Sequence, residues 1–297
     1  MNLLEIFPEL KTEKLHMDKK MNNIIEKKII SPVVFILKVA APEIAKKRKA
    51  GQFIILRTCD NGERIPLTIA DADPNEGWIE LVFQVVGKTT RLLSELNAGD
   101  SICDLVGPLG SPTHIEKYGT VVVVGGGIGI APAHPIAQAF KKAGNNVISI
   151  LGGRNKELII MEDKMRAASN EVLISTDDGS YGTKGLVTDI IKKLIDDGVK
   201  IDMLIAVGPT IMMKFISLLT KQYNIPTQVS LNTIMVDGTG MCGSCRVTVG
   251  NETKFVCVDG PEFDGHKVNF DEMMNRQKMY RTQEKESMDA HVCSCAS

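Results

Sequence analysis

Three cysteines in the last quarter of the sequence have the spacing of metal ligands. Cys242 and Cys245 are separated by two residues on a glycine-containing loop, and Cys257 follows across a predicted hairpin. Thiolates are soft donors that suit an iron–sulfur cluster or zinc. Three cysteines that meet by chance are the alternative, and the glycines around them favour a ligand loop.

A glycine-rich turn joins a predicted buried strand to a predicted helix in the stretch VVVVGGGIGIAPAHPIA. Glycines let the backbone approach a pyrophosphate, and the helix N-terminus offers it free N–H groups and a positive dipole end. A tight structural turn is the alternative, but the strand before and the helix after favour nucleotide binding. The candidate residues are Gly125, Gly126, Gly127, Ile128, Gly129, Ala131 and Pro132.

Three more turns follow the later predicted strands, and ligands of open α/β sheets bind beyond such strand ends. The residues of these turns are Gly153 with Arg154, Asp177 with Asp178, and Gly208 with Pro209. Arg154 either contacts a phosphate or ribose or is a solvated surface arginine. The two aspartates either contact the ligand or cap the segment that follows them.

A second group of candidates lies in the first half of the chain. Arg64 precedes Pro66, Leu67 and Thr68 on a predicted strand, and an arginine binds phosphate through a fork of donors. An ordinary strand with an exposed arginine is the commoner case. The stretch GKTTRLLSEL then opens an amphipathic helix whose N-terminus is a second candidate phosphate site. Gly87, Thr89 and Thr90 lie there, and a plain N-cap is the alternative role of the threonines.

The elements that must position these residues fall into regions of different pattern. Residues 22–115 hold short strands with turn signals, which predict a small antiparallel β-barrel. Residues 116–232 alternate apolar strands with helices, which predicts a parallel, doubly wound α/β domain. The cysteine segment follows at 233–265, then a charged helical tail at 266–297, and residues 1–21 form an N-terminal extension.

Composition excludes several classes of function. The 297 residues are 43% hydrophobic, which is enough for two cores, and the net charge of -1 offers no basic field for nucleic acid. No apolar run reaches the roughly 20 residues that a membrane span needs. The first residues are charged and lack the apolar core of a signal peptide, so we expect a cytoplasmic protein. Seven unevenly spread cysteines do not form the pattern of a disulfide framework.

The order of the motifs resembles the ferredoxin-reductase family. RxPLT, GxTT, GPLG and GGGIGIAP follow one another within residues 22–232. The resemblance implies FAD on the barrel at 22–115 and NAD(H) on the domain at 116–232. It implies that Arg64 and Thr90 contact the flavin phosphates. The residues that it places along the flavin ring are Pro66, Leu67 and Thr68, with Gln84 and Val85 beside the ribityl or adenine part.

Pro66 stands where the family usually has an aromatic residue, which is the pattern of the dihydroorotate dehydrogenase B electron-transfer branch. That branch holds a 2Fe–2S cluster with Cys-x4-Cys-x2-Cys and a distant cysteine. Here Asp237 occupies the first position, so the resemblance implies Asp237, Cys242, Cys245 and Cys257 as ligands. A zinc site, or an Asp237 that only caps the turn, remains open.

The aspartate and the stretch TDDGSYGTKG resemble the small subunits of NADH-dependent reduced ferredoxin:NADP oxidoreductases, which are electron-bifurcating transhydrogenases. The resemblance implies hydride exchange between NAD(H) and FAD, and single-electron exchange with a partner through the cluster. The implied partner is a larger flavin and iron–sulfur subunit related to glutamate synthase, which handles NADP and ferredoxin. Hydride transfer itself needs no side-chain acid or base, so we expect no catalytic side chain.

Two alternatives stay open for the function. One is the electron-transfer subunit of NAD-dependent dihydroorotate dehydrogenase B, against which Asp237 argues. The other is a non-catalytic assembly module with vestigial cofactor loops, against which the intact glycines argue. Near the end of the chain, Cys293 and Cys295 either bind metal with His291 or belong to a frayed tail.

Overall fold

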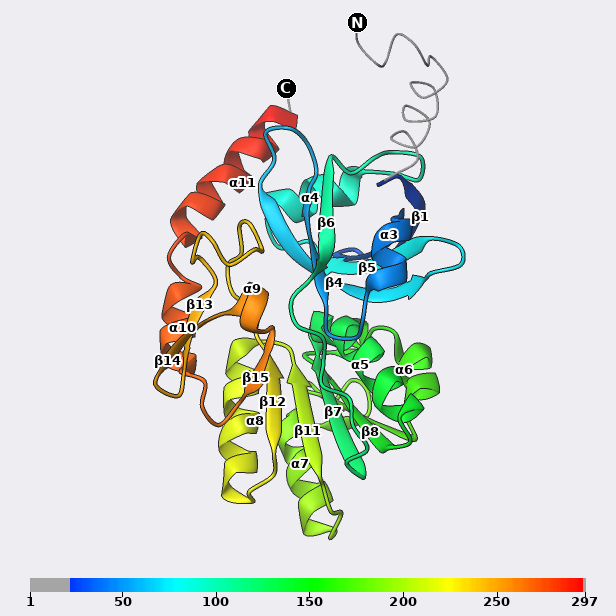
Figure 1. The fold of residues 1–297 in the computed structure, drawn as a ribbon, viewed down its shortest axis with the longest axis vertical. Helices are drawn as coiled ribbons and strands as arrows, with labels where there is room; N and C mark the ends of the chain where they lie inside the picture. The colour runs from blue at the N-terminus through cyan, green and yellow to red at the C-terminus, as the bar shows by residue number, and fades with distance from the viewer. Residues whose placement is uncertain (1–21, 296–297) are drawn as a thin grey trace, which may run out of the picture.

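The first unit is an antiparallel sheet of six strands with the order β1-β2-β5-β4-β3-β6. The computed structural model describes residues 22–295, and Figure 1 shows their arrangement. Two helices, α3 (Pro42–Lys47) and α4 (Lys88–Glu95), lie between strands in the chain. The strands are β1 (Ile24–Ser31), β2 (Val34–Ala40), β3 (Phe53–Arg57), β4 (Arg64–Asp73), β5 (Trp78–Gln84) and β6 (Asp104–Leu109).

This sheet has the predicted antiparallel strands without confirming a closed barrel. β1 and β6 stand at its two ends. In the described chain, a bridge between Asn23 and Ser101 connects the two ends of the sheet. Backbone hydrogen bonds between residues 22–24 and 99–102 accompany this bridge. A full ladder between β1 and β6 is not formed within residues 22–295.

Strand β5 shows how the sheet is packed on both faces. Leu81 and Phe83 are buried in the core of the first unit. Val82 points to the opposite face and belongs to a core that is shared with the next unit. Because successive strand residues face opposite sides, one apolar run supplies both cores. The first unit is therefore fixed against the second by buried side chains.

The second unit is a seven-stranded sheet with the order β10-β9-β8-β7-β11-β12-β15. Its strands run parallel except for β15, which is antiparallel to β12. The strands are β7 (Thr120–Gly126), β8 (Asn146–Gly153), β9 (Glu171–Thr176), β10 (Thr183–Lys184), β11 (Met203–Val207), β12 (Thr227–Ser230) and β15 (Glu262–Asp264). The helices are η1 (Gly127–Gly129), α5 (Ile130–Lys142), η2 (Lys156–Leu158), α6 (Glu162–Ala168), α7 (Val187–Asp196) and α8 (Thr210–Gln222).

The predicted doubly wound arrangement is visible in the central strand β7. Val122 and Val124 pack in the core that contains α7 and α8. Val121 and Val123 pack in the core that contains α5 and α6. A strand that is buried on both faces has a continuous apolar run, which explains the sequence TVVVVGG.

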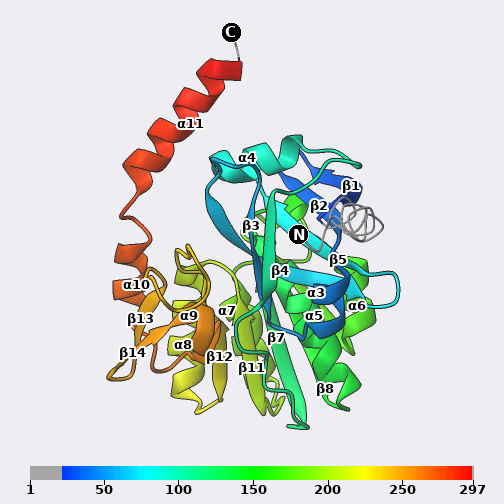
Figure 2. The ribbon, with the colours of Figure 1, turned by 45° about the horizontal axis from the view of Figure 1, so that its top comes forward.

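The cysteine segment and the C-terminal helices complete the described chain. A hairpin of β13 (Arg246–Val249) and β14 (Glu252–Phe255) is followed by the short helix α9 (Val256–Asp259) and then by β15. The helix α10 (Phe270–Arg276) packs its Phe270 and Met273 into the core. The helix α11 (Arg281–Cys295) reaches helix α4 of the first unit and contacts it, and Figure 2 shows it as a separate long helix at the edge of the molecule. Within the described chain, no helix is both long and apolar enough to cross a membrane.

Polar contacts also fix the two large units to each other. The His134 Nδ1 atom of α5 lies 3.1 Å from the Ala70 carbonyl oxygen of β4. The Lys164 ammonium of α6 bonds to Asp71 at 3.2 Å and to the buried Glu80 at 2.7 Å. Burial lowers the pKa of His134, which favours its neutral ring. These contacts hold α5 and α6 against strands β4 and β5.

Candidate functional site

The glycine-rich turn lies at the topological switch point of the parallel sheet. From β7 the chain moves outward to β8 and β9, and then returns to place β11 on the other side of β7. Ligands of such sheets bind beyond the carboxyl ends of the strands at this point. The turn after β7, with Gly126 to Gly129, and the turn after β11, with Gly208 and Pro209, therefore flank the same crevice.

Glycine is favoured at two positions of the first turn for different physical reasons. A β-carbon on Gly129 would lie 2.3 Å from the Val207 carbonyl oxygen, so only glycine lets α5 start this close to β11. Gly127 has φ +55, and a β-carbon there would meet no protein atom within 4 Å. The turn thus has open space above Gly127 and the N-terminus of α5, as an approaching pyrophosphate requires. Ile128, Ala131 and Pro132 lie in the same stretch.

The turns after β8 and β9 are joined to each other by backbone hydrogen bonds. The Asp177 N–H donates to the Gly153 oxygen at 3.0 Å, and the Asp178 N–H donates to the Arg154 oxygen at 3.2 Å. The Asp178 carboxylate accepts the Ser180 N–H at 2.8 Å, and this contact with Ser180 holds the pKa of Asp178 below its ordinary value. Asp178 therefore caps its turn, while the side chains of Arg154 and Asp177 are exposed.

The predicted flavin residues occupy strand β4 and the start of α4. Arg64 is exposed, and its guanidinium forms no hydrogen bond or ion pair with the side chains and backbone that the structure describes at residues 22–290. Pro66, Leu67 and Thr68 follow it on β4 and are half-buried. The Thr89 hydroxyl donates to the Glu63 carboxylate at 3.3 Å, which links the start of α4 to the start of β4. An uncommitted guanidinium beside a helix N-terminus fits an anionic cofactor.

The Thr90 hydroxyl has a capping role in this structure. It accepts the N–H groups of Val86 at 3.0 Å and Gly87 at 3.1 Å, and it donates to the Gly87 oxygen at 2.9 Å. Its predicted contact with a flavin phosphate stays a prediction. A β-carbon on Gly87 would meet nothing within 4 Å, so this turn is open. Gln84 and Val85, both half-buried, lead into it from the end of β5.

The structure brings two of the predicted metal ligands into direct contact. Cys245 and Cys257 are buried, and their sulfur atoms are 3.2 Å apart. Burial, followed by the nearby Cys245, raises the pKa of Cys257 to about 12. Cys242 is exposed on the same loop, and hydrogen bonds from Ser244 lower the pKa of its thiol. A lowered pKa favours the thiolate, which is the form that binds metal.

Asp237 is tied to the cysteine loop through backbone groups. Its carboxylate accepts the Thr239 N–H at 2.9 Å and the Cys242 N–H at 3.0 Å. This is the capping role that the sequence left open, and it places the carboxylate beside Cys242. Among the side chains that the structure describes, no three of His, Cys, Asp or Glu are grouped as a metal would need. The donor chemistry fits an iron–sulfur cluster, and the four-ligand set stays a prediction.

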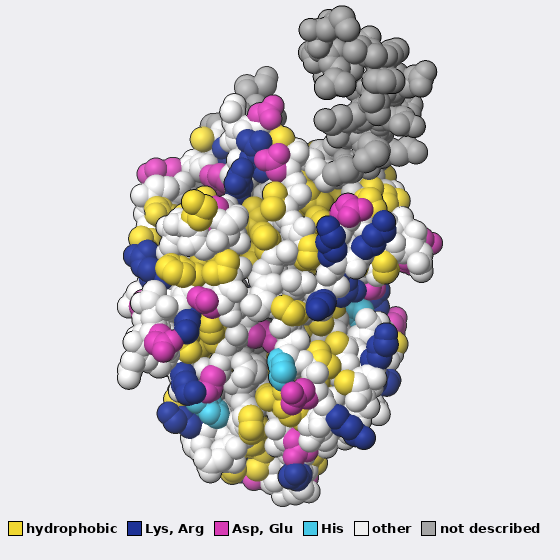
Figure 3. Space-filling view, viewed as in Figure 1, with side chains coloured by type: hydrophobic (Ala, Val, Ile, Leu, Met, Phe, Trp, Pro, Cys, Tyr) yellow, Lys and Arg dark blue, Asp and Glu magenta, His cyan; other side chains and the backbone are white. Residues whose placement is uncertain are grey.

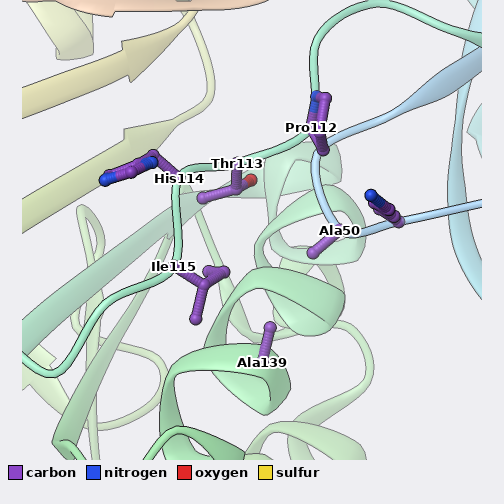
Figure 4. Close-up of a pocket in the computed structure, with 7 residues that line it drawn as sticks. Ala50, Pro112, Thr113, His114, Ile115 and Ala139 are labelled. Carbon is purple, nitrogen blue, oxygen red and sulfur yellow. The ribbon is translucent and has the colours of Figure 1, made fainter.

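The sequence patterns did not single out Glu262 on β15. Its carboxylate accepts the Thr113 hydroxyl at 2.6 Å, and burial raises its pKa to about 7. Thr113 lies in the connection between the two large units, beside a shallow hollow that Figure 4 shows. That hollow contains none of the predicted cofactor residues. Cys293 and Cys295 lie outside the side chains that the structure describes.

Family models match two of the three predicted cofactor regions. A model for the iron–sulfur cluster binding domain of dihydroorotate dehydrogenase B matches residues 232–269. A model for the oxidoreductase NAD-binding domain matches residues 123–217. These matches confirm NAD(H) and an iron–sulfur cluster among the predicted cofactors, and the predicted bounds at 116–232 and 233–265 stay predictions.

Full-length similarity extends to several named proteins. The chain is 52% identical over 269 residues to a homolog of the dihydroorotate dehydrogenase B electron transfer subunit from Thermotoga maritima, covering 91% of this chain and 95% of that one. It is 34% identical to the electron transfer subunit from Desulforamulus reducens, covering 81% and 94%.

Comparison with solved structures shows similarity to related oxidoreductases. A chain from the structure of an NADH-dependent reduced ferredoxin-NADP oxidoreductase, described in terms of flavin-based electron bifurcation, has a TM-score of 0.87 and 50% identity, covering 92% of this chain and 98% of that one. A ferredoxin NADP+ reductase from Neisseria gonorrhoeae, at TM-score 0.51 and 18% identity, covers 67% and 89% and shares the fold alone.

Proposed function

The chain belongs to the family of dihydroorotate dehydrogenase B electron-transfer subunits, and from this premise we propose that it is the small subunit of a flavin-based electron-bifurcating transhydrogenase. It is an oxidoreductase subunit that works in a complex, with FAD, NAD(H) and a 2Fe–2S cluster as cofactors. The observation that carries the finer proposal is the likeness along 92% of the chain to a subunit of an NADH-dependent reduced ferredoxin-NADP oxidoreductase.

The residues of this chain bind and orient the cofactors. Arg64 and the open turn at Gly87 hold the flavin phosphates, and Pro66 to Thr68 border its ring on a sheet that serves as the flavin barrel. The turns after β7 and β11 hold the dinucleotide. FAD, when bound, couples two-electron to one-electron transfer, because hydride carries two electrons and an iron–sulfur cluster carries one. We infer that Asp237, Cys242, Cys245 and Cys257 bind that cluster.

The partner docks beside the cysteine loop. Figure 3 shows hydrophobic side chains gathered over the loops next to α9, below α11. Exposed apolar residues of this part of the chain include Val236, Met241 and Val258, and Met241 is 89% exposed. A large apolar side chain at that exposure is common on docking surfaces. We infer a larger flavin and iron–sulfur subunit related to glutamate synthase, which handles NADP and ferredoxin.

The second candidate is the electron-transfer subunit of NAD-dependent dihydroorotate dehydrogenase B. The names of relatives at 34% identity and the matched iron–sulfur domain favour it. Purification of the tagged chain from its native cell, with identification of the bound partner, separates the two. The bifurcating function predicts NADH oxidation that requires both reduced ferredoxin, as the second electron donor, and NADP+, as the acceptor. Reduction of NAD+ by dihydroorotate, with a dihydroorotate dehydrogenase as the partner, would replace it.

The nucleotide preference is testable on the same complex. We infer that this subunit prefers NAD(H), although the exposed Arg154 follows β8, where a basic residue can accept a 2′-phosphate. Titration of the flavin absorbance with NADH and NADPH compares the two affinities. Tighter binding of NADPH would overturn the preference.

A further inference from the structure

The C-terminal end of helix α10 contacts two candidate sites with consecutive residues. The Arg276 Nη2 atom donates to the Ser244 carbonyl oxygen at 3.1 Å. The Gln277 Nε2 atom donates to the Asn232 carbonyl oxygen at 2.9 Å, and the Gln277 Oε1 atom accepts the Thr210 hydroxyl at 3.0 Å. One contact reaches the cysteine loop and the other reaches the nucleotide domain.

Packing fixes α10 in the place that these contacts need. Asn269 caps its first turn by accepting the Glu272 N–H at 3.1 Å. Met273 is buried against the core of the nucleotide unit. The Lys214 ammonium of α8 bonds to Asp271 at 2.7 Å. The end of α10 is therefore a rigid base for Arg276 and Gln277.

Arg276 fixes the peptide between two predicted iron ligands. Ser244 directly precedes Cys245 and is two residues after Cys242. Arg246 also donates to this loop, at the Gly243 oxygen and 3.1 Å, but it belongs to the same turn. Arg276 comes from another element, so its bond ties the loop to the folded body. Groups that bond to the surroundings of metal ligands hold those ligands in shape.

Gln277 anchors the same helix end beside the nucleotide crevice. Thr210 is buried and is the first residue of α8, directly after Gly208 and Pro209. The Thr210 hydroxyl also bonds to the Asn232 side chain at 3.2 Å. This small network joins the turn after β11, the segment after β12 and the end of α10.

We propose that Arg276 and Gln277 form a clamp that positions the Cys242–Cys245 loop against the nucleotide domain. Arg276 is the positioning residue for the cysteine loop, and Gln277 is its anchor. The clamp assigns the end of α10 to the iron–sulfur site rather than to a solvated tail. The inference rests on the proposed binding of a 2Fe–2S cluster by this loop.

The test measures two properties of the purified, cluster-containing full chain: the rate at which a chelator removes iron, and the reduction potential of the cluster. Arg276→Met removes the donor and a positive charge while keeping a long stem. We expect iron release to be roughly tenfold faster and the potential to fall, because a nearby positive charge favours the reduced cluster. Gln277→Leu should speed iron release and leave the potential near that of the parent.

Two further variants control this test. Arg276→Lys keeps the charge, so its potential should lie closer to that of the parent than that of Arg276→Met. Lys278→Met removes a charge from an exposed neighbour and should change neither property. Circular dichroism and flavin content show whether Arg276→Met folds. If it does not, the iron-release rates of Arg276→Lys and Gln277→Leu test the proposed clamp instead.

The outcomes separate the inference from the function on which it rests. A parent chain that binds no iron after anaerobic reconstitution contradicts the proposed function. An iron-loaded parent whose release rate and potential are matched by Arg276→Met and Gln277→Leu overturns the clamp alone.

Discussion

Asp237 has a capping role and a proposed metal-binding role, and single substitutions separate the two. Its carboxylate accepts the N–H groups of Thr239 and Cys242. Asp237→Asn keeps an oxygen acceptor for the turn but removes the negative charge that an iron ligand provides. We expect Asp237→Asn to lose iron and Asp237→Cys to keep a cluster with a shifted potential and electron paramagnetic resonance spectrum.

Asp73 is a matched control for this substitution. Its carboxylate accepts the N–H groups of Asn75 at 2.8 Å and Glu76 at 3.0 Å, so it caps a turn in a similar way. Asp73→Asn should leave the iron content unchanged. Asp237 is not a ligand if Asp237→Asn and Asp237→Cys both match the parent in iron content, potential and spectrum. The dihydroorotate alternative then gains equal support.

Arg64 offers a second test at the level of one side chain. Its guanidinium has no partner among the described side chains of residues 22–290, so its removal breaks none of the contacts that the structure describes. Arg64→Ala should lower the affinity for FAD by roughly tenfold or more, since a charge-assisted bond to phosphate is lost. Flavin content after dialysis measures the effect. Arg91→Ala, an exposed arginine on α4, is the control, and full flavin occupancy in Arg64→Ala would show that the site is elsewhere.

The nucleotide turn is a test at the level of an element, because the described chain offers a comparable glycine away from the turn. Gly127 and Gly198 both have positive φ, at +55 and +80, and neither would bring a new β-carbon within 4 Å of another atom. Alanine at either position should cost about 1 kcal/mol of stability. Only Gly127→Ala should weaken NADH binding, because its methyl group enters the dinucleotide space. Equal NADH affinity in both variants, measured by titration, would remove Gly127 from the site.

Local elements were predictable where one segment of sequence carries the whole signal. The continuous valines of β7 and the glycines after it predicted a buried parallel strand and its turn, and both are present. The contact between the two ends of the first sheet joins residues 22–24 to residues 99–102, which are far apart in the chain, so no local pattern predicts it. The Arg276 contact with Ser244 was not predictable for the same reason. The charged sequence around Arg276 predicts a solvent-exposed helix, and the cysteine loop that it contacts is distant in the chain.

At the scale of the whole molecule, one junction ties the flavin unit, the nucleotide unit and the cysteine segment together. Gln52 of the first unit donates to the Gly110 oxygen at 2.8 Å. The Ser111 N–H donates to the oxygen of Gly260, which lies within the cysteine segment, at 2.6 Å. Thr113 then bonds to Glu262 on the edge strand of the nucleotide sheet. The contacts around Glu262 therefore contribute to the relative placement of the three candidate sites, together with the His134 and Lys164 contacts between the two large units.

Glu262 should make the stability of this junction depend on pH. Its folded pKa is about 7 because burial penalises the charged form, whereas the ordinary value is 4.5. Between these values the folded carboxyl keeps its proton and the unfolded one loses it, so its contribution to stability is full below 4.5 and is lost as pH rises through 7.

Glu262→Gln stays neutral and keeps an oxygen for Thr113. Its free energy of unfolding relative to the parent should therefore rise by on the order of 2 kcal/mol from pH 5 to pH 8. Denaturant titrations followed by circular dichroism measure this difference, with the exposed Glu171→Gln as the control. A difference that stays constant between the two pH values would mean that the Glu262 carboxyl is already ionised at pH 5, and that the junction holds a charge which its surroundings must stabilise.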